Sequence, residues 1–270
     1  MDTRTCRDWH DFHDVIRELR TTRGREMLSD VVMPIEILYR GQADSTWELS
    51  TTLEREGYGG WSVLEYTELT YSVAPKIEIF AGRKWDMPPL EPNHDEVRTG
   101  TRGALPRVLN YPFWVYLRHH GFPSPLLDWS LSPYVAAYFA LHEKVTAERA
   151  AVFAYIEHPR LGKVGGCRQP LISTFTNEVA AHPRHFLQQC RYSIATKSIG
   201  TLMSFCPHSE IFNEEREDQD LLFKIELPRQ ERLEALRELQ LFNISHYNLF
   251  QGEDALVRQL AMECFDLEDL

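Results

Sequence analysis

The chain has 270 residues, 43% of them hydrophobic and 26% charged, a composition typical of a globular protein with a substantial core. Its formal net charge of −11 argues against broad, charge-driven binding of nucleic acid, which requires a basic face. Its five scattered cysteines lack C-x-x-C spacing, and no apolar run approaches the length of a signal core or a membrane span, so we expect a cytoplasmic protein with reduced thiols and no membrane association.

The N-terminal part of the chain predicts an amphipathic helix. From Asp8 to Arg20 the apolar residues recur with the helical period and form one stripe that needs a partner. We assign residues 1–30 to an N-terminal helical segment and residues 31–270 to the main domain.

A strand, an extended segment and a helix follow. Residues 35–39 predict a short strand that ends at Arg40-Gly41, and residues 47–53 predict an extended segment. Residues 61–80 predict a helix that Pro75 interrupts, because proline lacks the backbone N–H of a helix interior.

The middle of the chain alternates helices and short strands. The proline-rich residues 86–106 predict a loop or lid. We then expect a helix over residues 108–118, a short strand over 128–130, a helix over 133–143 with Ser132 as its N-cap, and a strand over 151–156.

The last third of the chain is less regular. Residues 162–182 look loop-rich and residues 186–196 show no clean period. The remaining predictions are a strand over 221–227, an amphipathic helix over 230–240, a strand or turn over 244–250 and a last helix capped by Asp254. This mixture of strands and helices indicates an α+β or α/β domain without regular βαβ units.

Arg40 is the first candidate for chemistry. An arginine at the end of a strand can hold a phosphate or carboxylate with two hydrogen bonds, and Gly41 beside it would let a ligand approach the backbone. Taken alone, such an arginine is more often part of a structural ion pair.

Asp128, Trp129 and Ser130 form the second candidate. They precede a helix N-terminus, where backbone amides and hydroxyl groups attract anions, so Ser130 and Ser132 could contact a phosphate or a sugar. The alternative is that Asp128 organises buried hydrogen bonds and that the serines only cap the helix.

His119 and His120 precede this strand, and they suggest two further kinds of site. Adjacent histidines rarely chelate one ion and no second ligand cluster follows, so we predict no metal site. A hydrolase triad of Ser130, His119 and Asp128 lacks the G-x-S-x-G elbow, which argues against it.

Two neighbouring carboxylates, Glu253 and Asp254, follow the apolar residues 244–250. They are either a catalytic pair, or a solvated side chain beside a helix cap. The chain has neither G-x-x-x-x-G-K-[ST] nor G-x-G-x-x-G, so the sequence supports no P-loop and no Rossmann site.

In combination these motifs resemble the FRG domain family, named for its (F/Y)-R-G motif. The resemblance runs from about Ile35 to Leu260 and rests on Tyr39-Arg40-Gly41, His119-His120-Gly121-Phe122-Pro123, Leu126-Leu127-Asp128-Trp129-Ser130 and Tyr138-Phe139-Ala140. The closing motif of the family is altered, since Gln251 and Gly252 replace its proline and first aspartate.

The order of the motifs is also similar to that of ADP-ribosyltransferases of the Arg-Ser-Glu type. In that class an early strand ends in arginine, a middle strand carries serines and runs into a helix, and a late strand carries the catalytic glutamate. Arg40, Ser130 and Glu253 occur in this order here. The resemblance implies an α+β fold with an ADP-ribosyltransferase-like split mixed sheet and flanking helices.

The same resemblance implies NAD⁺ as the substrate and gives each candidate residue a role. Arg40 with Tyr39 and Gly41 would bind the pyrophosphate, and Ser130 the ribose. Trp129 or Tyr138 would form the nicotinamide wall, Glu253 or Asp254 would stabilise the positive charge of the transition state, and His119 and Asp128 would orient the acceptor.

The resemblance to FRG proteins also implies a role in bacterial phage defence. The protein would then be a toxin that modifies a macromolecule, and a cognate antitoxin protein would be its partner. We favour RNA slightly over protein as the acceptor. A local basic lip of Arg83, Arg98, Arg102 and Arg107 would offset the acidic balance of the chain.

A non-catalytic binding module is the alternative. Such a module would recognise a nucleotide-like ligand or a protein partner without turnover, and the altered closing motif at Gln251-Gly252 is its main support.

Overall fold

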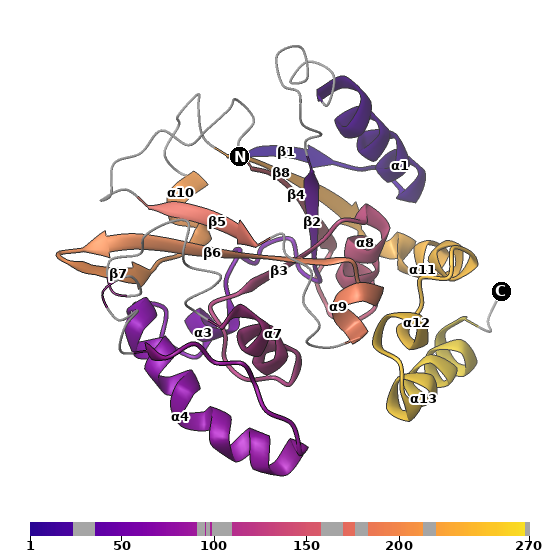
Figure 1. Cartoon of the computed structure of the whole chain (residues 1–270). Helices are drawn as coiled ribbons and strands as arrows, with labels where there is room; N and C mark the ends of the chain where they lie inside the picture. The colour runs from indigo at the N-terminus through magenta and orange to yellow at the C-terminus, as the bar shows by residue number, and fades with distance from the viewer. Residues whose placement is uncertain are drawn as a thin grey trace.

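The computed structural model describes residues 1–23, 36–90, 95, 98, 110–157, 170–175, 183–212 and 220–267. Eight strands form one mixed sheet in the order β1-β8-β4-β2-β3-β6-β5, with β7 paired to β6 (Figure 1). The strands are β1 (Asp2–Thr5), β2 (Ile37–Gln42), β3 (Leu127–Ser130), β4 (Arg149–Ile156), β5 (Leu171–Phe175), β6 (Cys190–Ile199), β7 (Leu202–Phe205) and β8 (Leu221–Pro228).

Helices flank this sheet, which confirms the predicted α+β class. They are α1 (Trp9–Glu18), α3 (Thr52–Arg55), α4 (Val63–Ala81), α7 (Tyr111–His119), α8 (Pro133–Leu141), α9 (Pro183–Leu187), α10 (His208–Phe212), α11 (Arg232–Leu241), α12 (His246–Phe250) and α13 (Glu253–Met262). No described helix is both long enough and apolar enough to cross a membrane.

The sheet has a narrow junction between β2 and β3. These strands share one register pair within the described chain, Tyr39 with Ser130, whereas β2 pairs with β4 from Ile37 to Gln42. Figure 1 shows β5, β6 and β7 running across the direction of β2, β4 and β8. Since the strands separate beyond the Tyr39–Ser130 pair, the residues next to it have room for side chains between the two halves.

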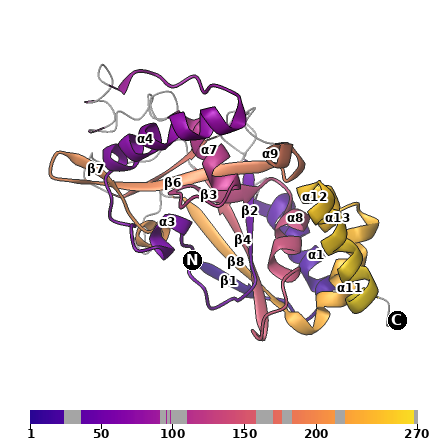
Figure 2. The same cartoon turned by 90° about the horizontal axis from the view of Figure 1, so that it is seen from below.

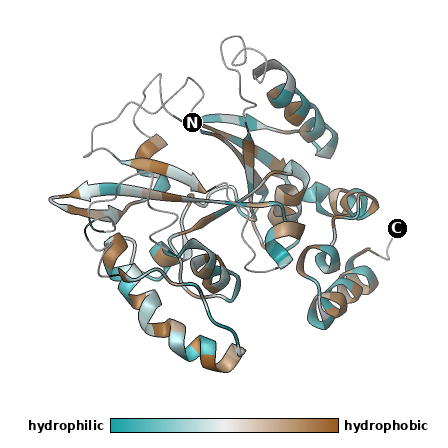
Figure 3. Ribbon diagram, in the orientation of Figure 1, coloured by the Kyte–Doolittle hydropathy of each residue, from teal (hydrophilic) through white to brown (hydrophobic). Residues whose placement is uncertain are grey.

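Helices α1, α8 and α11 bury one face of the half formed by β2, β4 and β8. Their apolar residues make one core with that face, which includes Phe12, Val135, Val152 and Leu236. Both hydrophilic and hydrophobic residues are visible along α1 in Figure 3, and the apolar stripe predicted for it is the part that enters this core.

A second core holds the other half. Tyr66 of α4 and Trp114 of α7 pack with Tyr192 and Ile194 of β6. Figure 2 shows α7 lying between α4 and β6. Because α7 ends at His119 next to the β2–β3 junction, its last turn reaches the space between the two halves of the sheet.

Strongly patterned elements match their predictions. Helices α1, α7, α8 and α11 and strands β3, β4 and β8 lie where we expected them, within a few residues. Ser132 caps α8 as predicted, because its hydroxyl accepts a hydrogen bond from the backbone N–H of Val135.

Several predicted elements differ from the structure in part. The extended segment predicted over residues 47–53 ends early, because α3 begins at Thr52, where Thr51 and Glu54 complete a capping box. Helix α4 runs through Pro75 without interruption. Residues 246–250 form helix α12 instead of the strand or turn predicted there, and the N-cap of α13 is Gly252 instead of Asp254.

Four of the described strands were not predicted. They are β1, which pairs with β8 in parallel, β5 and β6, which occupy segments without a clean hydrophobic period, and β7, which pairs with β6. The boundary assigned at residue 30, the start of the strand at Ile35, most of residues 86–106 and residues 162–169 and 176–182 lie outside the described residues.

Candidate functional site

A cavity of about 740 Å³ opens at the junction of the two sheet halves. Residues of β2, β3, α8 and α9 line it, together with the last turn of α7 and Phe250 of α12. Of the predicted site residues, seven line the cavity: Tyr39, Arg40, Gly41, His119, Asp128, Trp129 and Ser130. Its volume is in the range of sites for small molecules and cofactors.

Positive charge dominates this cavity. Among the described residues, four arginines line it, Arg40, Arg55, Arg118 and Arg184, against the three carboxylates of Glu48, Asp128 and Glu143. One of these carboxylates, that of Asp128, is neutralised by an ion pair with Arg118. The cavity is therefore a place where an anion is favoured, although the whole chain is acidic.

Arg40 lies at the strand position that faces the gap beside the Tyr39–Ser130 pair. Its Nη1 donates to the backbone carbonyl of Asp128 at 2.9 Å, and its Nε is buried without a hydrogen-bond partner among the described residues. Burial lowers the pKa of Arg40 to about 10, so the side chain keeps its charge at neutral pH. A buried, charged donor with an unused N–H is a ready site for an anionic ligand.

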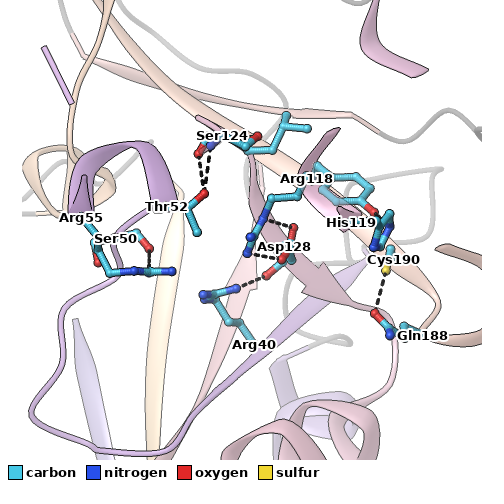
Figure 4. Close-up of polar contacts among 12 residues, drawn as sticks. Arg40, Ser50, Thr52, Arg55, Arg118, His119, Ser124, Asp128, Gln188 and Cys190 are labelled. Atoms are coloured by element: carbon cyan, nitrogen blue, oxygen red, sulfur yellow. Dashed lines mark hydrogen bonds and ion pairs between the residues drawn. The ribbon is translucent and has the colours of Figure 1, made fainter. Parts of the chain in front are cut away.

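Asp128 holds the arginines in place (Figure 4). Arg118 donates to both carboxylate oxygens of Asp128, from Nε at 3.2 Å and from Nη2 at 2.6 Å. Burial alone would raise the pKa of Asp128, but the charges of Arg118 and Arg40 outweigh it and lower that pKa. Asp128 is thus the organiser of buried hydrogen bonds that the sequence offered as one alternative.

Trp129 is fixed by a buried chain of hydrogen bonds. Its Nε1 donates to Ser193 Oγ at 2.7 Å, and that hydroxyl lies 2.9 Å from Nε2 of the buried His208. Burial lowers the pKa of His208 to about 3, so this ring is neutral and its Nε2 accepts the hydroxyl proton. The indole also stacks on Tyr155, which leaves it as a rigid wall of the cavity.

Ser130 and His119 do not form a hydrolase triad. Ser130 Oγ donates to the carbonyl of Gln188 at 2.8 Å, and His119 Nε2 lies 2.8 Å from the hydroxyl of Tyr192. The thiol of Cys190, which also lines the cavity, is not a nucleophile either, because burial raises its pKa to about 12.

Gly41 lines the cavity and also has a packing role that the sequence did not indicate. A Cβ at this position would lie 1.9 Å from the carbonyl oxygen of Ala136 and 2.6 Å from the amide nitrogen of Ala140. The glycine therefore allows β2 to pack directly against the backbone of α8, whether or not a ligand is present. This contact sets the position of Arg40 relative to the helix.

Of the two tyrosines in the predicted site, one lines the cavity and the other does not. Tyr39 lines the cavity and is buried with its hydroxyl unpartnered among the described residues. Tyr138 does not line this cavity, and its hydroxyl lies 3.0 Å from His246 Nδ1. The aromatic wall is made instead by Trp47, Trp129, Phe139 and Phe250.

Glu253 and Asp254 lie outside the cavity lining. Both are exposed in the first turn of α13, where their charge favours the helix N-terminus. The predicted late strand that would deliver a glutamate is absent from this segment, which consists of α12 and α13. Strand β6 pairs with β3 at the cavity. The residues that line the cavity from this strand and the position just before it are Cys190 and Gln188.

The candidate site predicted from the sequence did not include the cavity residues Arg118, His142, Arg184 and Gln188. Arg184 Nε donates to the carbonyl of Phe250 at 3.2 Å, and Gln188 Nε2 donates to that of Leu249 at 3.0 Å, so α9 and α12 form one wall. The basic residues in the last turns of α7 and α9 were a usable signal, whereas the meeting of α9 with α12 depends on the fold.

Arg83 and Arg98, the described residues of the predicted basic lip, do not line the cavity. Arg83 stacks on the ring of Trp85 at 3.8 Å from its centroid, and Arg98 pairs with Asp95. Arg102 and Arg107 lie outside the described residues. Within the described chain, no three histidine, cysteine or acidic residues gather as a metal site would require.

Residues 35–149 match the family model of the FRG domain. Neither a curated protein nor a solved structure matches the chain. The matched region includes β2, α7, β3 and α8, which carry Arg40, Arg118 and Asp128. It ends before α9, β6 and α12, which complete the cavity.

Proposed function

We propose that the cavity binds NAD⁺ and that the protein transfers ADP-ribose from it to a macromolecule. The observation that carries this proposal is the convergence of Arg40, Arg118 and Arg184 on one aromatic-walled cavity at the β2–β3 junction. A dinucleotide combines two phosphates with flat rings, and the cavity offers cations and aromatic faces in the same space.

The residues present fit such a ligand. Arg40 has an unused, buried Nε–H, and Arg55 and Arg184 add charge at the wall of the cavity, so these side chains would hold the two phosphates. Trp47 and Phe250 would cover the rings and exclude water. Bound NAD⁺ supplies a glycosidic bond whose cleavage releases nicotinamide and makes ADP-ribose available for transfer.

Arg118 contributes through Asp128. By neutralising that carboxylate, Arg118 prevents it from repelling the phosphates, while Asp128 keeps Arg40 oriented through its backbone carbonyl. The positive charge of the transition state requires a carboxylate elsewhere in the cavity. Glu48 and Glu143 line the cavity and are not ion-paired to an arginine in the described structure.

The resemblance to ADP-ribosyltransferases supports the transfer step. Arg40 and Ser130 occupy adjacent strands as that class requires, and the strands diverge beside them. We extend the proposal to a phage-defence toxin restrained by an antitoxin, with RNA favoured slightly over protein as the acceptor. This extension rests on the family resemblance alone.

A non-catalytic nucleotide-binding module is the second candidate. The observation that favours it is the position of Glu253 and Asp254, which are exposed and do not line the cavity. Such a module would bind NAD⁺ or a related nucleotide through the same arginines and release no nicotinamide.

One experiment distinguishes the transferase from the non-catalytic binding module. The protein is incubated with NAD⁺ labelled in the adenosine part and with cell extract, and the label is followed into RNA and protein fractions while free nicotinamide is measured. The transferase predicts nicotinamide release and label transfer that Arg40→Ala abolishes. Binding of NAD⁺ without nicotinamide release would establish the module, and absence of binding would refute both candidates.

A further inference from the structure

His142 is a cavity residue that none of the roles above uses. It follows α8 as its C-cap and lines the cavity together with Phe139 and Glu143. The side chain is half-buried, and its ring stacks on Tyr138, with centroids 5.1 Å apart and planes inclined by 18°. The imidazole is therefore held in a defined orientation at the end of the cavity formed by α8.

The hydrogen bonds of His142 define its tautomer. Nδ1 lies 3.2 Å from the backbone carbonyl oxygen of Phe139. A carbonyl only accepts, so Nδ1 carries the proton of the neutral ring and Nε2 carries a lone pair. A neutral imidazole with a free lone pair at one nitrogen is the form that a general base requires.

A carboxylate lies beside that lone pair. Glu143 Oε1 is 3.8 Å from His142 Nε2, so protonation of the ring would create an ion pair with Glu143. Asp128, another carboxylate of the cavity, is already paired with Arg118. His142 and Glu143 thus form an acid–base pair in a cavity that otherwise offers mainly cations.

The neighbours of His142 keep the ring neutral. Burial lowers the pKa of His142, and the charge of Arg232 acts in the same direction, while Glu143 and the hydrogen bond to Phe139 oppose it. The titratable and charged groups around it among the described residues come from α8, α11, α12, α13 and the residues that follow α8 and α13. They are Tyr138, Glu143, Lys144, Arg232, His246, Arg258 and Asp266. The ring is deprotonated and ready to accept a proton at pH 7.

We propose that His142 is the general base of the reaction and that Glu143 stabilises the charge it acquires. This proposal rests on the proposed function, ADP-ribose transfer to a macromolecule, and takes a hydroxyl group of that macromolecule as the acceptor. In the step, the bond between ribose C1 and the nicotinamide nitrogen breaks and its electrons leave with neutral nicotinamide. The acceptor oxygen forms the new bond to C1, and its proton moves to His142 Nε2.

Transfer rates of single variants test this assignment. His142→Gln should lower the rate of label transfer by roughly 100-fold or more and leave NAD⁺ binding within about twofold, since a general base acts on the transition state. In the wild type kcat/KM should fall as the pH drops through the pKa of His142, which lies below 6.5, and this acidic limb should disappear in the variant. Glu143→Gln should lower the rate by about tenfold, because the imidazolium loses its partner.

Matched controls separate this role from a general effect of substitution. His120→Gln replaces an exposed histidine whose pKa is also lowered and which does not line the cavity, and Glu148→Gln replaces an exposed glutamate near Glu143. Both controls should keep the wild-type rate and pH profile.

Each contrary outcome has a distinct meaning. Transfer by His142→Gln at the wild-type rate, with the acidic limb intact, would overturn the role of His142 and leave the proposed function standing. Wild-type rates for Glu143→Gln combined with inactivity of Glu253→Gln would move the carboxylate to Glu253 and overturn the pair. A wild type that binds NAD⁺ without releasing nicotinamide would overturn the proposed function and this inference together.

Discussion

At the scale of single residues, the site depends on Asp128, which binds two arginines through different atoms. Asp128 binds Arg118 through its carboxylate and Arg40 through its carbonyl oxygen. The carboxylate is matched by one guanidinium, so the second arginine retains an uncompensated charge and an unused Nε–H. An anion that entered the cavity would complete this arrangement.

Replacing Asp128 with asparagine tests the ion pair. We expect Asp128→Asn to lower the free energy of unfolding at pH 7 by about 1–3 kcal/mol, because Arg118 loses its carboxylate. The pKa of Asp128 is lowered in the folded protein, so its contribution is complete above the unfolded pKa of about 3.9 and is lost as the pH falls through the folded pKa.

Denaturant unfolding should therefore show that the free energies of unfolding of the wild type and of Asp128→Asn converge as the pH falls from 7 to 3. Asp14→Asn removes an exposed partner of Arg17 and should change stability by less than about 0.5 kcal/mol. A stability difference for Asp128→Asn that stayed constant over this pH range would show that the carboxylate is not the stabilising group.

Gly41 offers a second test at this scale. Gly41→Ala places a methyl group against the backbone of Ala136 and Ala140, which side-chain rotation cannot relieve. We expect a loss of about 1–3 kcal/mol or more in the free energy of unfolding. Gly60→Ala is the control, since a Cβ there meets nothing within 4 Å, and should be close to neutral. Equal stabilities for the two variants would refute the packing role of Gly41.

The sequence identified the centre of the site but not its boundary. Tyr39, Arg40 and Asp128 were predictable because their motifs combine charged residues with short apolar strands. Tyr138 was misplaced because a continuous apolar helix gives no indication of which face meets the cavity. Glu253 was expected near the cavity on the assumption of a strand, and it lies instead on an exposed helix turn.

At the scale of elements, α4 shows how tertiary contacts override a local signal. Proline inside a helix costs about 3 kcal/mol, yet α4 continues through Pro75 because Tyr66 and Thr70 are buried before it and Ala74 beside it. The proline itself lies on the exposed face of α4, so its own ring is not buried in a core.

Pro75→Ala should therefore stabilise the protein. We expect a gain of about 1–3 kcal/mol in the free energy of unfolding, measured by denaturant titration, because alanine restores the missing helical hydrogen bond. Pro112→Ala is the matched control, since Pro112 is exposed in the first turn of α7, where proline is tolerated. A loss of stability in Pro75→Ala would mean that the ring makes contacts that the helix needs.

Elements with one clear period were predictable and those with mixed patterns were not. Strand β4 is a continuous apolar run buried on both faces, and α1 has one apolar stripe. Strand β6 was missed because polar residues such as Ser193 and Thr196 are buried in it. They are compatible with the interior because Ser193, for example, bonds Trp129 and His208, contacts that no local pattern encodes.

At the scale of the whole molecule, the site lies where the sheet is least continuous. One register pair in the described chain joins β2 to β3, and the strands separate where Arg40 and Trp129 project. The described residues that line the cavity at this junction are mainly cationic, although the whole chain is acidic. Such a junction depends on pairings between distant segments, so composition and periodicity did not predict it.

The most direct test of the central claim is calorimetric titration of NAD⁺ into the folded protein. We predict saturable binding that weakens as salt is raised, and that weakens by roughly tenfold or more in Arg40→Ala and in Arg184→Ala, since each loses a charge-assisted hydrogen bond. Arg17→Ala, which removes an exposed arginine outside the cavity, should bind like the wild type. Equal affinity in all four proteins, or no binding to a folded wild type, would contradict the assignment of this cavity to NAD⁺.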